Sequence, residues 1–113
     1  MSRDEEHVLD ILEAARRALA FVAGMTDRQF LNDLKTQSAV LHQLTVVGEA
    51  TRRVSDAFRS EHPDVSWKEM AGLRSRIVHD YDEVDLDQVW AVLDKDLPRL
   101  IPRLEAIAKS EPE

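Results

Sequence analysis

The composition is most informative in what it lacks. The chain of 113 residues has no cysteine, only three glycines and four prolines, and 5% aromatic residues. The absence of cysteine excludes a disulfide scaffold, a thiol nucleophile and cysteine-ligated metal sites. So few turn-forming residues disfavour an all-β fold. No apolar run approaches the roughly 18 residues of a membrane span, and the acidic start MSRDEEHVLD does not resemble a secretory signal. We therefore expect a soluble, cytoplasmic protein with one domain over residues 1–113.

Charge is acidic overall but unevenly distributed. The net charge of −7 argues against a protein that coats nucleic acid non-specifically, because such affinity comes from neutralising phosphates. Residues 52–79, however, carry six basic and four acidic side chains, whereas the segments on either side are net acidic. We therefore expect an anionic ligand to dock locally against this middle segment.

Hydrophobic periodicity predicts helices along the whole chain. Apolar residues recur at intervals of three and four, as they do on one face of a packed helix. The predicted helices cover residues 4–21, a short stretch from residue 26, residues 33–59, residues 67–81 and a last helix from residue 86. The pattern is typical of an all-α fold, an antiparallel bundle of four to five helices.

Capping residues and helix breakers set the expected boundaries. Three pairs have the spacing of a capping box, namely Thr26 with Gln29, Ser66 with Glu69 and Asp85 with Gln88. Gly24 should end the first helix, and His62-Pro63 should end the long one. A close approach between helices is the expected reason for Gly48 inside the long helix. Pro98 and Pro102 should kink or interrupt the last helix, because proline lacks a backbone donor.

An arginine stands on the apolar face of the helix predicted over residues 67–81. At about 100° per residue, the apolar and aromatic side chains of this segment fall in an arc of about 160°, and Arg74 lies near the middle of that arc. A charge in such a place requires a partner or a function. One interpretation is that Arg74 snorkels to water or pairs with a carboxylate of another helix. The other is that it binds an anionic ligand.

His79 follows Arg74 by five residues, which is about 140° of helical rotation, so the two side chains do not share a face of a straight helix. A joint site needs one of two arrangements. Either the helix ends near Val78 and His79 turns back, or two copies of the helix meet across a two-fold axis. The wide apolar arc favours the second arrangement. A histidine that only interacts with the helix dipole is the simpler alternative.

The segment from Arg74 to Tyr81 has the pattern arginine, four residues, histidine, any residue, tyrosine. This pattern resembles the HEPN superfamily (higher eukaryotes and prokaryotes nucleotide-binding), and within it the HepT-like ribonuclease toxins of HepT/MntA toxin–antitoxin systems. The lead-in SWKEMAGL, the stretch VVGEA in the long helix and VDLDQVW after the motif are also similar to family segments. The resemblance covers nearly the whole chain and implies a HEPN-like helical domain that forms a homodimer.

The resemblance also implies a metal-independent endoribonuclease without a cofactor. Histidine can transfer protons near neutral pH, and arginine can grip a phosphate with two parallel donors, so His79 and Arg74 are the expected catalytic residues. Ser75 and Arg76 are the expected RNA- or phosphate-binding residues. Many family members carry asparagine, aspartate or histidine where this chain has the shorter Ser75. Arg76 can alternatively pair with Asp80 at i+4, which we favour.

Tyr81 has a separate role by resemblance, as the residue to which a partner nucleotidyltransferase antitoxin attaches AMP. A bulky anion beside the phosphate-binding arginine would occupy the position of the substrate. A tyrosine in a core or an interface, with its hydroxyl at the rim, is the alternative.

Other functions fit the sequence less well. The acidic run over residues 80–87 lacks the glycine and the closing glutamate of a calcium loop, and no zinc motif or glycine-rich phosphate loop is present. The leading alternative to the toxin is a non-catalytic helical partner that binds or supports a nucleotidyltransferase. A third possibility is a helical dimer in which the motif is only structural.

Overall fold

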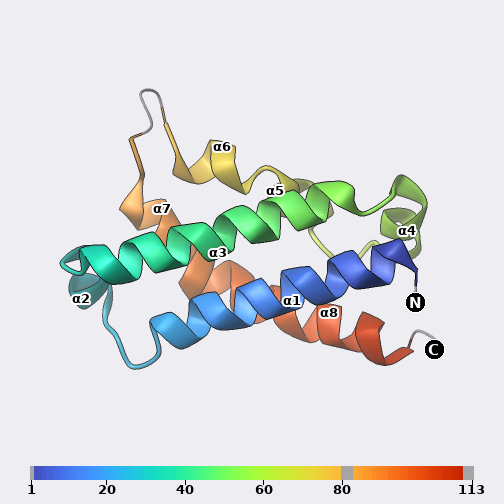
Figure 1. Ribbon diagram of the computed structural model, residues 1–113, viewed down its shortest axis with the longest axis horizontal. Helices are drawn as coiled ribbons and strands as arrows, with labels where there is room; N and C mark the ends of the chain where they lie inside the picture. Colours follow the sequence, from blue (N-terminus) through green and yellow to red (C-terminus); the bar gives the residue numbers. More distant parts are fainter. Residues whose placement is uncertain (1, 80–82, 111–113) are drawn as a thin grey trace.

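The computed structural model describes residues 2–79 and 83–110, and the fold there is all-α. Its helices are α1 (Arg3–Phe21), α2 (Asp27–Leu31), α3 (Leu34–Arg53), α4 (Asp56–Glu61), α5 (Trp67–Ala71), α6 (Leu73–Ile77), α7 (Leu86–Ala91) and α8 (Leu97–Ser110), with a π-helical segment at Val92–Asp96. The long helices α1 and α3 run antiparallel, and α8 packs against α1 (Figure 1). The expected antiparallel helical bundle is confirmed.

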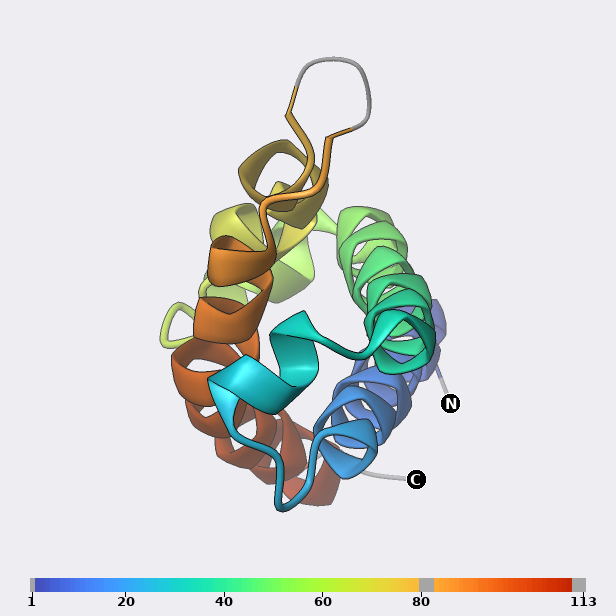
Figure 2. The same cartoon turned by 90° about the vertical axis from the view of Figure 1, so that its left-hand side faces the viewer.

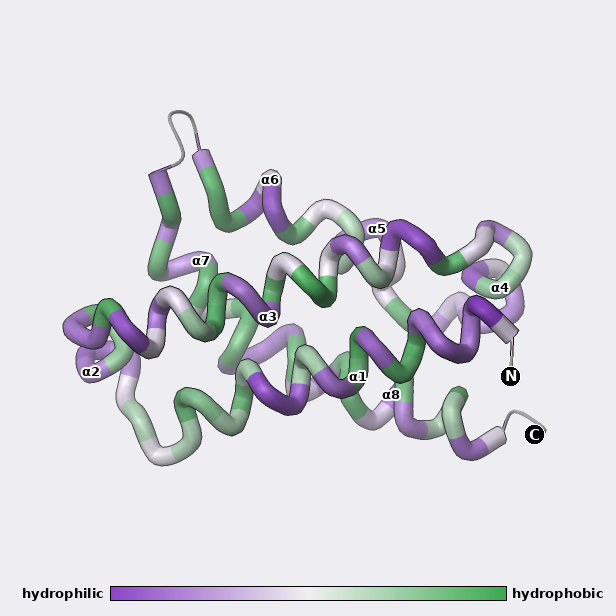
Figure 3. The backbone as a smooth tube through the Cα atoms, in the orientation of Figure 1, coloured by the Kyte–Doolittle hydropathy of each residue, from purple (hydrophilic) through white to green (hydrophobic). Residues whose placement is uncertain are grey.

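The hydrophobic core lies inside a ring of helices. Viewed from the end, α1 and α3 form one side of the ring, α7 and α8 form the other, and α5 and α6 close it (Figure 2). Apolar residues recur along the helices at the predicted spacing (Figure 3), and the buried side chains include Ile11, Leu44, Leu73 and Leu104. No helix of the described residues is long and apolar enough to span a membrane.

Side-chain caps define the beginnings of α1 and α2, and the second of these is predicted from the sequence. The Ser2 hydroxyl accepts a hydrogen bond from the Glu5 amide, and Thr26 and Gln29 form the reciprocal capping box. Gly24 has a φ of 79°, a left-handed conformation that glycine adopts without strain, and it turns the chain between α1 and α2.

The helix predicted over residues 33–59 is wrong in its C-terminal part. The helix α3 ends at Arg53, the next residue Val54 adopts an extended conformation, and α4 begins at Asp56. Ser55 caps α4, and its amide and hydroxyl both donate to the Asp4 carboxylate, at 2.8 and 2.7 Å. This contact with the start of α1 is a tertiary interaction, so the periodicity of the segment did not reveal it.

The helix predicted over residues 67–81 is also divided. Gly72 separates α5 from α6, and α6 ends at Ile77. Ser66 makes no side-chain cap, contrary to the prediction. Beyond α6 the chain becomes extended, with Val78 bridged to Val84 in an antiparallel pair. The resulting arms, residues 78–79 and 83–84, project away from the bundle (Figures 1 and 2).

The prolines act differently from one another. Pro98 occupies the first turn of α8, directly after the π-helical segment Val92–Asp96. Because a proline ring clashes with the carbonyl four residues earlier, a wider turn just before Pro98 relieves the crowding. Pro102, by contrast, lies inside α8 without ending it, so the predicted interruption occurs only near Pro98.

Gly48 brings two helices together, as predicted. A Cβ atom at this position would lie 3.6 Å from the Met70 carbonyl oxygen of α5, so the surface of α3 is in van der Waals contact with the α5 backbone. One turn further along α3, the Arg52 Nε donates to the Ala71 carbonyl at 3.0 Å. These contacts fix the distance between α3 and the segment that carries Arg74.

Candidate active site

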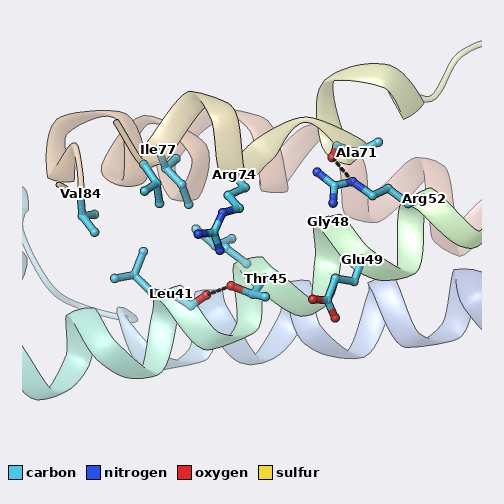
Figure 4. A pocket seen from close by; sticks show the side chains of 11 residues that line it. Leu41, Thr45, Gly48, Glu49, Arg52, Ala71, Arg74, Ile77 and Val84 are labelled. Carbon is cyan, nitrogen blue, oxygen red and sulfur yellow. Dashed lines mark hydrogen bonds between the residues drawn. The ribbon is translucent and has the colours of Figure 1, made fainter. Parts of the chain in front are cut away.

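Arg74 lies on α6 and is exposed, contrary to the shielded position that the helical wheel predicted. The reason is the division of the helix at Gly72 and Ile77, which breaks the continuous apolar arc. The side chain extends from α6 toward α3 into a pocket between the two helices (Figure 4). The pocket has a volume of about 130 Å³. The guanidinium is therefore open to solvent and borders a cleft at the same time.

The pocket has an apolar end and a polar end. Leu41 and Leu44 of α3, with Ile77, Val78 and Val84, form the apolar end. Thr45, Glu49 and Arg52 form the polar end, and Figure 4 places the Arg74 guanidinium between the two ends. Arg74 also takes part in an interaction within the chain, but a guanidinium has five donors.

His79 lies in the first extended arm after α6. Its side chain is 56% exposed, and its Nε2 lies 3.7 Å from an Asp85 carboxylate oxygen. Backbone hydrogen bonds hold the arms together, because the His79 amide donates to the Glu83 carbonyl at 2.7 Å and the Asp85 amide donates to the Ile77 carbonyl at 2.8 Å. His79 thus stands on a paired hairpin rather than on a helix, so the helix ends near Val78, as the first of the two arrangements requires.

One chain does not bring Arg74 and His79 into one pocket. Successive side chains of an extended segment point to opposite faces, and Val78 lines the pocket of Arg74 whereas His79 lines a wider groove of about 420 Å³. That groove also contains Leu31 and the carboxylates of Glu83, Asp85 and Asp87. The helix end therefore releases His79 without bringing it into the pocket of Arg74.

Asp85 is a site residue that the sequence interpretation missed. Its capping role is confirmed, because one carboxylate oxygen accepts from the Gln88 amide at 3.1 Å. The other oxygen is the one near His79. The hairpin creates this second role, and the i+6 spacing from His79 to Asp85 carries no signal for it in a sequence read as helical.

Arg76 has a structural position. Its Nε donates to the Gln88 side chain at 2.9 Å, and a terminal nitrogen pairs with Asp96. These contacts join α6 to α7 and to the π-helical segment. Gln88 thereby bonds Arg76 rather than returning to the cap at Asp85. Asp80, the partner favoured for Arg76 from the sequence, lies outside the described residues.

The structure assigns no role to Ser75, a further predicted site residue. Ser75 is exposed on α6, and it lines neither the pocket of Arg74 nor the groove of His79. Tyr81 lies outside the residues that the structure describes. Within residues 2–79 and 83–110, no three histidine or acidic side chains cluster so as to hold a metal ion.

Comparison with known proteins identifies relatives over most of the chain. The family described as Ribonuclease HepT-like matches residues 11–107. A protein of Methanocaldococcus jannaschii named "Putative RNase" is 37% identical over 100 residues, which cover 88% of this chain and 83% of the relative. A second protein of that organism with the same description is 34% identical over 98 residues, covering 87% and 90%.

A third relative comes from Thermococcus cleftensis. This protein, named "Probable ribonuclease HepT", is 33% identical over 105 residues, which cover 93% of this chain and 96% of the relative. No solved structure matches the chain significantly. The family match includes Arg74, His79 and Asp85, and the chain therefore belongs to the HepT-like ribonuclease family.

Proposed function

We propose that the protein is an endoribonuclease that acts as the toxin of a toxin–antitoxin pair and cleaves RNA without a metal ion. Membership of the HepT-like ribonuclease family supports the activity, as do the relatives named as ribonucleases. The observation that carries the proposal is the exposed Arg74 guanidinium at a cleft, close along the chain to an exposed histidine beside a carboxylate.

The chemistry uses the nucleophile that RNA itself supplies. A base removes the 2′-hydroxyl proton, the oxygen attacks the adjacent phosphorus, and the bond to the 5′-oxygen breaks as that oxygen takes up a proton. The products are a 2′,3′-cyclic phosphate and a 5′-hydroxyl end. His79 transfers the protons, and Arg74 binds the phosphate and stabilises the charge that develops on it. The position of Asp85 allows it to orient the imidazole of His79.

We infer that two copies of the chain complete the site. Within one chain Arg74 and His79 line different pockets, so a phosphate on Arg74 needs an imidazole from another copy. A two-fold axis near the hairpins would bring each arginine toward the histidine of its partner, so that a dimer would hold two such sites. The homodimer is thus part of the proposed mechanism.

The decisive experiment is RNA cleavage by the purified protein, freed of any antitoxin, with the product ends analysed. We expect His79→Ala to lower the cleavage rate by at least about 100-fold, the usual scale of general acid–base catalysis. The matched control is His42→Ala, since His42 is also exposed but lies on α3 outside the pocket of Arg74 and the groove of His79. Equal cleavage by the His79→Ala variant would refute the proposed mechanism. Absence of cleavage by the wild-type protein would instead favour a non-catalytic partner of a nucleotidyltransferase.

Regulation by AMP belongs to the same proposal and rests on the resemblance of the motif. A nucleotidyltransferase antitoxin would attach AMP to Tyr81, and the added phosphate would compete with RNA for Arg74. The intact mass of the protein after co-expression with that enzyme tests this step. We expect AMP additions in the wild-type protein and none in Tyr81→Phe. Additions that persist in Tyr81→Phe would contradict the assignment.

A further inference from the structure

The pocket between α3 and α6 has apolar lining residues that a phosphate site does not need. An arginine that only grips a phosphate requires no apolar cavity, yet here Leu41, Leu44 and Ile77 line one beside the Arg74 guanidinium (Figure 4). Pockets that are mostly apolar and contain a few convergent polar groups are typical of small-ligand sites. The apolar end therefore indicates a weakly polar group attached to the anion.

The size of the pocket matches a single ring. Its volume is about 130 Å³, and an apolar cavity of about 150 Å³ in another protein is known to accept benzene. A six-membered ring fills such a space, whereas the fused rings of a purine would extend beyond it into solvent. Among the bases of RNA, only the pyrimidines are single six-membered rings, and the ribose links each of them to a phosphate.

Charge favours a nucleotide over an apolar side chain of a protein partner. Arg74 lies between the two ends of the pocket and Arg52 lies at the polar end. Arg52 uses its Nε for the Ala71 carbonyl, which leaves its terminal nitrogens available as donors. Both arginines belong to residues 52–79, the one net-basic segment of an otherwise acidic chain.

We propose that this pocket binds a pyrimidine base of the RNA, with the adjoining phosphate on Arg74. The base lies between Leu41 and Ile77, and the polar end at Thr45 and Glu49 faces its exocyclic groups. The proposal deepens the proposed ribonuclease function and rests on it for the source of the nucleotide. It predicts that cleavage occurs preferentially next to pyrimidines.

The first test measures binding of free nucleotides by NMR chemical shifts. We expect uridine monophosphate to bind more tightly than adenosine monophosphate. Uridine without the phosphate, and ribose phosphate without the base, should each bind more weakly than uridine monophosphate. Thr45→Trp, at an exposed position on the α3 side of the pocket, should fill the space and weaken binding of uridine monophosphate by about ten-fold or more. Ser38→Trp is the matched control, because Ser38 is exposed on the same helix two turns away and does not line the pocket.

A second variant keeps the test independent of any folding defect in Thr45→Trp. Leu41→Ala enlarges the apolar end and should raise the affinity for adenosine monophosphate relative to uridine monophosphate. Tighter binding of adenosine monophosphate by the wild-type protein would overturn the assignment and indicate that the pocket receives an AMP group. Unchanged binding in Thr45→Trp, or an equal loss in Ser38→Trp, would also overturn it.

Cleavage kinetics separate this proposal from the proposed function. With RNAs that differ only at the nucleotide 5′ to the cleaved bond, we expect pyrimidines to be preferred and Thr45→Trp to raise KM more than it lowers kcat. If His79→Ala abolishes cleavage but the base preference is absent, the ribonuclease function stands and the pocket proposal is wrong. If the wild-type protein does not cleave RNA but binds uridine monophosphate in the pocket, the ribonuclease function is wrong and the nucleotide site stands.

Discussion

At the scale of single residues, Asp85 shows how one side chain can serve the fold and the site together. One of its carboxylate oxygens caps α7, and the other lies near the imidazole of His79. The cap fixes the carboxylate independently of His79. A carboxylate held in this way can orient the imidazole without losing much conformational freedom of its own.

Replacing Asp85 by asparagine separates these two roles. Asparagine caps helices about as well as aspartate, so the thermal midpoint of Asp85→Asn should stay close to that of the wild-type protein. The His79–Asp85 contact is long and half exposed, and such pairs contribute up to about 1 kcal/mol, or about a five-fold change. We therefore expect kcat to fall by no more than about five-fold. A fall of a hundred-fold would show that Asp85 does more than orient the imidazole.

Arg76 should matter for stability rather than for catalysis. It pairs with Asp96, whose side chain is only 22% exposed, and it bonds Gln88. Arg76→Ala leaves that carboxylate without its partner, so we expect the free energy of unfolding to fall by about 1–2 kcal/mol in chemical denaturation. The control is Arg99→Ala, at an exposed position of α8. A selective loss of RNA binding in Arg76→Ala, with stability unchanged, would restore the RNA-binding role predicted from the sequence.

At the scale of helices, local signals predicted the beginnings of elements better than their ends. The capping pair Thr26 and Gln29 and the cap at Asp85 involve neighbours in the chain, and both are confirmed. The end of α3 depends instead on the bond from Ser55 to Asp4, and the end of α6 depends on pairing between residues 77–79 and 83–85. The helical period continues across both boundaries, so no local pattern marks them.

The cap of α3 makes a prediction about pH. Hydrogen bonds from the Thr36 amide and hydroxyl lower the pKa of Asp33 below its usual value of 3.8. The stabilisation is therefore fully present above the pKa of the unfolded chain, and it is lost as the pH falls through the lower folded value. We expect the stability difference between wild type and Asp33→Ala, measured by urea unfolding, to be largest near neutral pH and to shrink in acid.

Asparagine provides the matched control for this cap, because Asp33→Asn keeps an acceptor that does not titrate. Relative to Asp33→Asn, the wild-type protein should become less stable as the pH decreases below 3.8. A difference between Asp33→Ala and wild type that does not change with pH would contradict the assigned role of the Asp33 charge.

At the scale of the whole molecule, the question is whether the site is shared between chains. Arg74 and His79 line different pockets of one chain, and this separation makes mixed dimers informative. We expect Arg74→Ala and His79→Ala to be inactive separately. When the two variants are mixed and allowed to exchange subunits, about half of the dimers are mixed, and each mixed dimer has one intact shared site of two. The mixture should therefore regain up to about a quarter of the wild-type activity.

The control for this experiment is each variant incubated alone under the same exchange conditions, which should stay inactive. Light scattering should give the mass of a dimer for the wild-type protein. Mixtures that stay inactive although subunits exchange would contradict the shared site and would place Arg74 and His79 of one chain in the same reaction centre.

The sequence determined the helical class, the caps at Thr26 and Asp85 and the family resemblance, because each of these depends on residues close together in the chain. Only the tertiary structure decided that Arg74 is exposed beside a two-ended pocket, that His79 stands near Asp85 on a hairpin and that Arg76 is bound to Asp96. The physical reason is that helix ends here are set by contacts between distant segments, and the end of a helix decides which way the next side chain points.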